Sequence, residues 1–198
     1  LDAVGAGGND WRLGVRLTGW VRHLERTGAH RPRLELALRA ARLALRRGAR
    51  WTARGMVEQA QAAAVRLRRD DELMADLAEV RDGVRALGLP ATPVPAPRMG
   101  AWLWSDQGLG LGPEQRADLL LAALDACPGD TALLGHLGHV GRELDLARCA
   151  AREQWARVRA LPADLDAALG LLDSLLHDGD TEGVRDLVRL LAGAAARA

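Results

Sequence analysis

The chain of 198 residues contains no Phe, Tyr, Ile or Lys, so its 6 aromatic side chains are all Trp and its 27 positive charges are all Arg. The absence of Lys excludes the phosphate-binding Lys of a P-loop, and neither Gly-rich segment, 5–8 or 108–112, follows a strand-like run. Ser105 and Ser174 are the only serines, and no Gly-x-Ser-x-Gly elbow surrounds either. The sequence therefore nominates no catalytic residue and no cofactor.

Cysteine and long apolar runs are also scarce. Cys127 and Cys149 are too few for a disulfide framework, and we expect two reduced thiols in a cytoplasmic protein. No stretch approaches the ~18 uncharged apolar residues of a membrane span. The chain begins at Leu1 without a basic-then-apolar leader, so we expect a trimmed piece of a longer protein rather than a signal peptide.

Helix-forming residues dominate what is present. Ala, Leu, Arg and Glu favour helices, whereas Val and Thr are too scattered for strands. Arg and Ala in place of Lys and Ile indicate a bacterium with a GC-rich genome. Residues 1–99 carry 18 Arg against 11 acids, a net charge of +7, and residues 100–198 carry 9 Arg against 15 acids, a net charge of −6. This asymmetry indicates either a basic half that contacts nucleic acid or two halves that attract each other.

Glycine and proline divide the chain into helical segments. A loose lead-in at 1–8 precedes a basic block at 1–88, with helices predicted at about 10–26, 32–47, 51–69 and 71–87. Asn9 or Asp10 is expected to cap the first helix and Asp70 or Asp71 the fourth. Four prolines between residues 90 and 97 predict an extended connector, placed at 89–112. The remaining block, 113–198, is predicted to hold helices at about 113–126, 131–143, 146–160, 164–177 and 181–193.

Pro128 and Pro162 are 34 residues apart, and each opens a pair of short helical segments. Together with Leu134, Leu137, Gly138 and Ala150, this spacing resembles the tetratricopeptide repeat (TPR) family. In the first block, the stretch from Leu43 to Ala60 resembles the TPR-type segments of large actinobacterial transcription regulators, and so does the region 128–177. The resemblance covers about residues 128–193. It implies antiparallel helix hairpins stacked as a short solenoid, although Gly141 stands where the family carries an aromatic residue.

In that family the first helix of each repeat lines a groove that binds a partner. By register, the resemblance assigns to the groove the charged and polar residues His139, Arg142, Glu143, Asp166, Asp173 and His177. Gly135, Gly138 and Gly141 each cost a helix ~1 kcal/mol relative to Ala, which predicts close packing of another chain segment along them.

Three further features have a functional and a structural interpretation. His136, His139 and Glu143 share a helix side and could bind zinc, although a solvated polar face is the favoured interpretation and no metal is predicted. The basic stripe either follows phosphates or forms ion pairs, with Glu35 and with the acidic second block; it consists of Arg39, Arg42, Arg46, Arg50 and Arg54. Trp102 and Trp104 would project to the same side if extended and could anchor a partner, or they could pack as core.

The favoured function is a scaffold or regulatory module that binds a protein or peptide through a helix-lined groove. The alternatives are an enzyme or enzyme subunit on a helical scaffold, and a nucleic-acid contact through the Arg-rich first block. No membrane partner is expected, and the exposed ends of a solenoid leave room for self-association.

Overall fold

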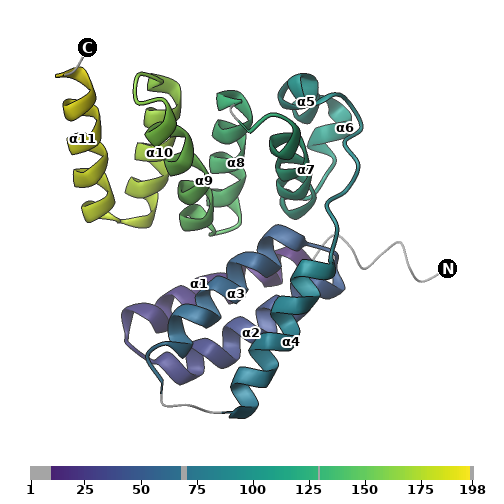
Figure 1. The fold of residues 1–198 in the computed structure, drawn as a ribbon. Helices are drawn as coiled ribbons and strands as arrows, with labels where there is room; N and C mark the ends of the chain where they lie inside the picture. Colours follow the sequence, from purple (N-terminus) through teal and green to yellow (C-terminus); the bar gives the residue numbers. More distant parts are fainter. Residues whose placement is uncertain (1–9, 68–70, 129, 197–198) are drawn as a thin grey trace. The chain divides into compact units, whose positions relative to one another are not determined.

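The structure, a computed structural model, describes residues 10–67, 71–128 and 130–196. Over these ranges the chain forms eleven α-helices and no strand, which confirms the all-α class expected from the composition (Figure 1). The expected lead-in at 1–8 and the candidate caps Asn9 and Asp70 lie outside the described residues. None of the described helices combines the length and the apolar character needed to cross a membrane.

The helices belong to two compact units, which are described separately. Unit 1 contains the residues up to Pro90 and the segment 112–118, and unit 2 contains residues 91–111 and the residues from Leu119 onward. This division places most of the expected connector, 89–112, within unit 2. It also assigns the first residues of the helix at 113–126 to unit 1.

Unit 1 is built around four helices that bury one apolar core. They are α1 (Asp10–Arg26), α2 (His30–Arg46), α3 (Arg50–Ala64) and α4 (Asp71–Ala86). The apolar side of α2 is buried, since α2 packs against the other three helices and Leu34 and Leu38 have exposed fractions of only 0% and 2%. Trp51 and Met56 of α3 are also fully buried.

Glycines end the first two helices, as the sequence predicted. Gly28 and Gly48 have φ angles of 70° and 73°, in the left-handed region that a residue with a Cβ disfavours. α2 begins two residues before Pro32, which occupies the first turn, where a missing N–H costs little. The predicted extension of the third helix to residue 69 is wrong, because Arg66 and Leu67 donate to carbonyls three residues back and tighten the chain into a turn.

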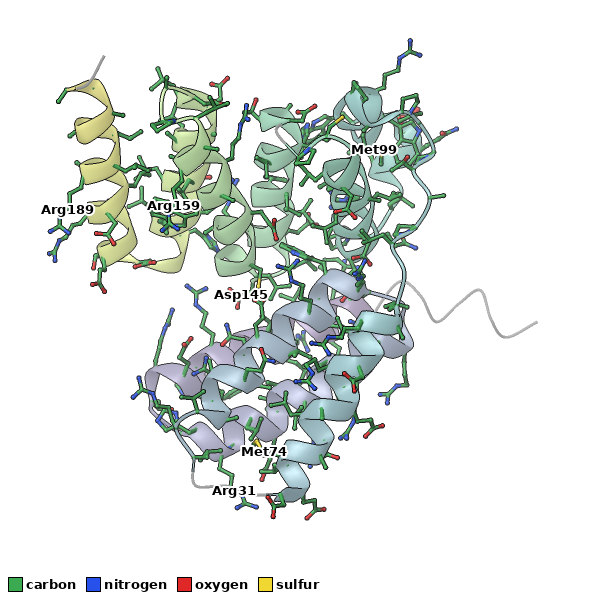
Figure 2. All side chains as sticks on the ribbon, in the orientation of Figure 1. Arg31, Met74, Met99, Asp145, Arg159 and Arg189 are labelled. Atoms are coloured by element: carbon green, nitrogen blue, oxygen red, sulfur yellow. The ribbon has the colours of Figure 1, made fainter. Side chains whose placement is uncertain are left out.

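The proline-rich segment is not an extended connector throughout. It contains α5 (Ala96–Leu103) and α6 (Asp106–Leu109). Pro95 is the N-cap of α5 and Pro97 lies in its first turn, where the backbone needs no N–H donor. The expectation failed because proline disrupts helix interiors rather than first turns. Met99, labelled on α5 in Figure 2, has an exposed fraction of 0%.

The remaining helices begin and end within two residues of the predicted positions. They are α7 (Pro113–Ala126), α8 (Thr131–Glu143), α9 (Ala147–Ala160), α10 (Leu165–Asp178) and α11 (Thr181–Ala195). Asp130, Asp164 and Asp180 cap α8, α10 and α11 by accepting from the N–H three residues ahead. From α8 onward each helix packs against the next, α10 also packs against α8, and neighbours run in opposite directions (Figure 1).

A buried polar pair joins α9 and α10. Gln154 and Ser174 have exposed fractions of 1% and 0%, and the Ser174 hydroxyl donates to Gln154 Oε1 at 2.8 Å. Gln154 Nε2 donates to the carbonyl of Leu134 on α8 at 3.4 Å. Gly138 makes room for this amide, since a Cβ at that position would lie 2.6 Å from Nε2. The close packing predicted for the glycines of this helix is therefore found at Gly138, whereas Gly135 faces open space.

Candidate partner-binding face

The outer sides of α8 and α10 hold all six residues that the family resemblance assigned to a groove. His139, Arg142 and Glu143 lie on α8, and Asp166, Asp173 and His177 lie on α10. Arg142 and Glu143 are half-buried and the other four are exposed. Within each helix their spacings of three, four, seven and eleven residues bring them to one side. Because α8 and α10 pack directly against each other, we name this surface the α8–α10 face.

One ion pair joins the two helices across this face. The guanidinium of Arg142 lies 2.5 Å from a carboxylate oxygen of Asp173, with side-chain exposures of 26% and 61%. A pair this exposed contributes only ~0–1 kcal/mol to stability. Its consequence is instead geometric, since it holds a cation and a carboxylate at fixed positions on the surface.

The face also carries an apolar row. Leu165, Leu169 and Leu176 of α10 have exposed fractions of 69%, 62% and 62%. Their spacings of four and seven residues bring them to one side of the helix. A single exposed leucine is ordinary, but three in a row beside an ion pair resemble the mixed apolar and polar surfaces that bind proteins.

Trp104 borders this face. It follows α5, which packs against α8, and its indole is 57% exposed. The indole centroid lies 5.8 Å from the ring of His136 and 6.3 Å from that of His139. The structure thus brings together an exposed aromatic ring and two imidazoles.

Trp102 has a different environment. It is half-buried, and its Nε1 donates to Gln107 Oε1 at 3.3 Å. Trp102 and Trp104 would share a side only if the segment were extended, but Trp102 lies in the last turn of α5 and Trp104 caps it. Residues two apart on a helix point to different sides.

His136 is the most perturbed imidazole of this region. Desolvation by burial is the main cause that lowers its pKa, and the nearby charge of His139 lowers it further. Gly100 of α5 admits the ring, since a Cβ there would lie 3.1 Å from His136 Nε2. Within the described ranges no three His, Cys, Asp or Glu side chains are grouped to hold a metal ion, so the zinc interpretation of His136, His139 and Glu143 gains no support.

The basic stripe of the sequence is divided between different environments. Arg42 lies 2.7 Å from Asp76 and 3.3 Å from Glu79, both on α4, and the hydrogen bond to Asp76 is the main cause that raises its pKa. Arg54 pairs with Glu58 at 3.3 Å.

The other arginines of the stripe do not form a continuous positive surface that a phosphate backbone could follow. Arg39 and Arg46 are exposed and Arg50 is half-buried. Glu35, the expected partner of the stripe, instead pairs with Arg31 at 3.1 Å, so that expectation is wrong. A phosphate track along all five arginines is therefore interrupted at Arg42, which α4 neutralises.

Unit 1 contains a buried polar site that the sequence did not indicate. The carboxylate of Asp118 accepts from the backbone N–H groups of Arg50 and Trp51, at 2.9 and 2.8 Å, and so caps the first turn of α3. Burial raises the pKa of Asp118 from 3.8 to about 6, and the two backbone hydrogen bonds oppose that rise. Glu114, one turn earlier, accepts from Arg47 at 2.6 Å, and both side chains are largely buried.

Comparison of the chain with protein-family models, with curated proteins and with solved structures finds no match.

Proposed function

We propose that the chain is a protein- or peptide-binding module that uses the α8–α10 face together with Trp104. One observation carries the proposal: Leu165, Leu169 and Leu176 are exposed in a row on a helix that buries Ala168, Leu171 and Leu175 on its other side. An exposed apolar row next to fixed charges and an indole provides anchors and orientation for a partner segment.

A TPR-like stacking of the helices is part of this proposal. Positions 34 residues apart on α8 and α10 are both exposed, as for Gly135 and Leu169 and for His139 and Asp173. This repetition is what two successive repeats would produce, with α8 and α10 as their first helices. The natural host is a regulator in the cytoplasm of an actinobacterium, a reducing compartment in which Cys127 and Cys149 would stay as thiols.

The charges of the face indicate the chemistry of the partner. Asp166 and Asp173 are exposed carboxylates, and Arg142 is the cation between the two helices. An extended or helical segment with apolar anchors and at least one Arg or Lys complements this pattern. The enzyme alternative gains no comparable support, because Asp118, the most perturbed carboxyl, is occupied in capping α3.

Selection from a peptide display library on the immobilised chain, followed by affinity measurement with synthetic peptides, tests the proposal. We expect Leu169→Glu and Trp104→Ala to weaken the selected peptides by ~10-fold or more, because each removes an anchor worth at least ~1.4 kcal/mol. Val65→Glu is the matched control, since Val65 is 83% exposed and follows α3 in unit 1.

The outcomes separate clearly. Peptides that lose affinity for both face variants but not for the Val65 variant support the face as the binding site. Peptides that bind all variants equally, or a selection that enriches no sequence, would contradict the proposal.

A further inference from the structure

α1 presents a second candidate surface, on unit 1. Its exposed residues Arg12, Leu13, Arg16, Trp20, His23 and Arg26 fall within roughly 140° of the helix circumference, given 3.6 residues per turn. We name these six residues the α1 face. The opposite side of α1 is occupied, since Gly14, Thr18 and Val21 are buried. The face is therefore an outer surface with its own composition.

Positive charge is concentrated in this part of the chain. Residues 10–67, which contain α1 to α3, carry 13 Arg against 4 Asp and Glu, a net charge of +9. No carboxylate belongs to the α1 face, and Glu25 of the same helix binds Arg33 on α2 at 2.9 Å. The five carboxylates of α4 lie on a helix that packs against α2 and α3, where Asp76 and Glu79 bind Arg42. The α1 face therefore favours a polyanion.

An exposed tryptophan on the α1 face indicates which kind of polyanion this surface would bind. Trp20 is 61% exposed, and Leu13, two turns earlier, is 46% exposed. The ring of His23 meets the indole at a centroid distance of 5.9 Å and an interplanar angle of 85°, an edge contact that orients the indole. Arg16 precedes Trp20 by one helical turn, so an aromatic plane and a guanidinium are neighbours on the surface. Aromatic planes beside cations are what proteins use to stack bases and bind the adjoining phosphates.

We infer that the α1 face binds single-stranded nucleic acid. Trp20 stacks on an unpaired base, while Arg12, Arg16 and Arg26 contact phosphates along ~21 Å of helix. An anionic membrane fits less well, because only two apolar side chains of α1, Leu13 and Trp20, are exposed and able to insert, while Val21 is buried and the other apolar residues of the helix are half-buried. An acidic peptide would satisfy the arginines but leave the exposed indole without a stacking partner. This inference does not depend on the proposed function.

The test is binding of a fluorescein-labelled 20-nucleotide oligo(dT) to the full chain, followed by anisotropy at several salt concentrations. Wild type is expected to bind with an association constant that falls as salt rises. Trp20→Ala should lower that constant roughly 5- to 150-fold, the range for loss of one base–aromatic stack. Arg16→Glu should also weaken binding and should flatten the salt dependence by ~0.7 in slope for each phosphate that the variant no longer neutralises.

Two variants serve as matched controls. Trp104→Ala removes an indole of nearly the same exposure, 57%, from unit 2. Arg85→Glu reverses a 70% exposed arginine of α4 and changes the charge of unit 1 by the same amount as Arg16→Glu. Both should bind oligo(dT) like wild type, and circular dichroism should show that all four variants fold.

Several results would overturn the inference. They are no binding of oligo(dT) at low salt, equal losses in Trp20→Ala and Trp104→Ala, and equal losses in Arg16→Glu and Arg85→Glu. Tighter Trp20-dependent binding to polyglutamate or to vesicles containing an anionic lipid would assign the face to a different class of partner. Because Trp104→Ala weakens peptide binding in the proposed function but not oligonucleotide binding here, the two proposals can fail separately.

Discussion

Ser174 on α10 donates its hydroxyl to Gln154 on α9, and neither side chain exposes more than 1% of its surface to solvent. A buried amide is tolerated in an apolar interior only when its polar atoms have partners. Gln154 Oε1 has the Ser174 hydroxyl, while Nε2 has the Leu134 carbonyl at the long distance of 3.4 Å. The pair therefore fixes the register of three helices, α8, α9 and α10, below the α8–α10 face.

Ser174→Ala should destabilise unit 2 by ~1–3 kcal/mol, because the carbonyl of Gln154 would remain buried without this donor. Urea unfolding followed by circular dichroism measures the decrease in stability. The double variant Ser174→Ala with Gln154→Leu should recover much of it, since both polar partners are then removed. Additive effects, with no coupling between the two positions, would show that the hydrogen bond does not stabilise the packing.

Substitution by alanine should change the stability of the protein in opposite directions at two glycines of α8. Gly135 faces open space, so Gly135→Ala should stabilise the helix by up to ~1 kcal/mol. At Gly138 the new Cβ would lie 2.6 Å from the amide of Gln154, and this overpacking should cost ~1–3 kcal/mol and exceed the helix gain. The thermal unfolding midpoints of both variants, each compared with that of the wild type, measure these changes.

The steric explanation for Gly138 has its own control. In a Gln154→Ala background the obstructing amide is absent, so Gly138→Ala should become neutral or stabilising. If Gly138→Ala is equally destabilising in both backgrounds, the close approach to Gln154 is not the reason for glycine at this position.

Features that depend on neighbouring residues were predictable from the sequence, and features that depend on distant residues were not. The bounds of α8 and α10 were predicted to within one residue, because helix ends depend on local contacts such as the caps Asp130 and Asp164, which bind N–H groups three residues ahead. Asp118, by contrast, binds Trp51, 67 residues earlier, and nothing near Asp118 in the chain indicates this role. The same limit applies to Gln154, whose burial depends on packing between α8, α9 and α10.

The candidate surfaces show a related limit. Asp173, which the family resemblance assigned to a groove, is exposed on α10, as expected for a polar residue on the side of an amphipathic helix away from the core. The spacing of charges along the sequence did not predict the ion pairs of Arg42, since its partners Asp76 and Glu79 lie on another helix. The sequence did not identify Trp20 as a surface residue; it is 61% exposed because α1 directs this side chain away from the core that Val21 enters.

His136 should make unit 2 less stable in mild acid. Its pKa is lowered from the ordinary 6.5 in the folded state, so the unfolded chain binds the proton more readily. The stability linked to neutral His136 is therefore present above pH 6.5 and is lost as the pH falls toward the folded-state pKa. His136→Gln should remove this loss, which urea unfolding of variant and wild type between pH 5 and 8 can measure. Parallel pH curves for the two proteins would contradict the prediction.

Asp118 should produce the opposite pH dependence in unit 1. Its folded-state pKa of about 6 lies above the ordinary 3.8, so the folded chain binds the proton more readily. The stability linked to protonated Asp118 is fully present below pH 3.8 and is lost as the pH rises through 6. Asn does not titrate, so Asp118→Asn is the reference. Relative to this variant, the free energy of unfolding of the wild type should decrease by on the order of 2–3 kcal/mol between pH 4 and 7.

The side-chain carboxyl carbon of Asp118, followed by NMR, gives a direct measure of the same quantity and does not depend on how the variant folds. A titration midpoint near 6 is expected because the carboxylate is removed from water, and its two backbone donors, Arg50 and Trp51, compensate for only part of that loss. A midpoint near 4 would mean that water reaches the carboxylate. In that case Asp118 would cap α3 without the desolvation penalty, and the stability difference between wild type and Asp118→Asn would not change between pH 5 and 7.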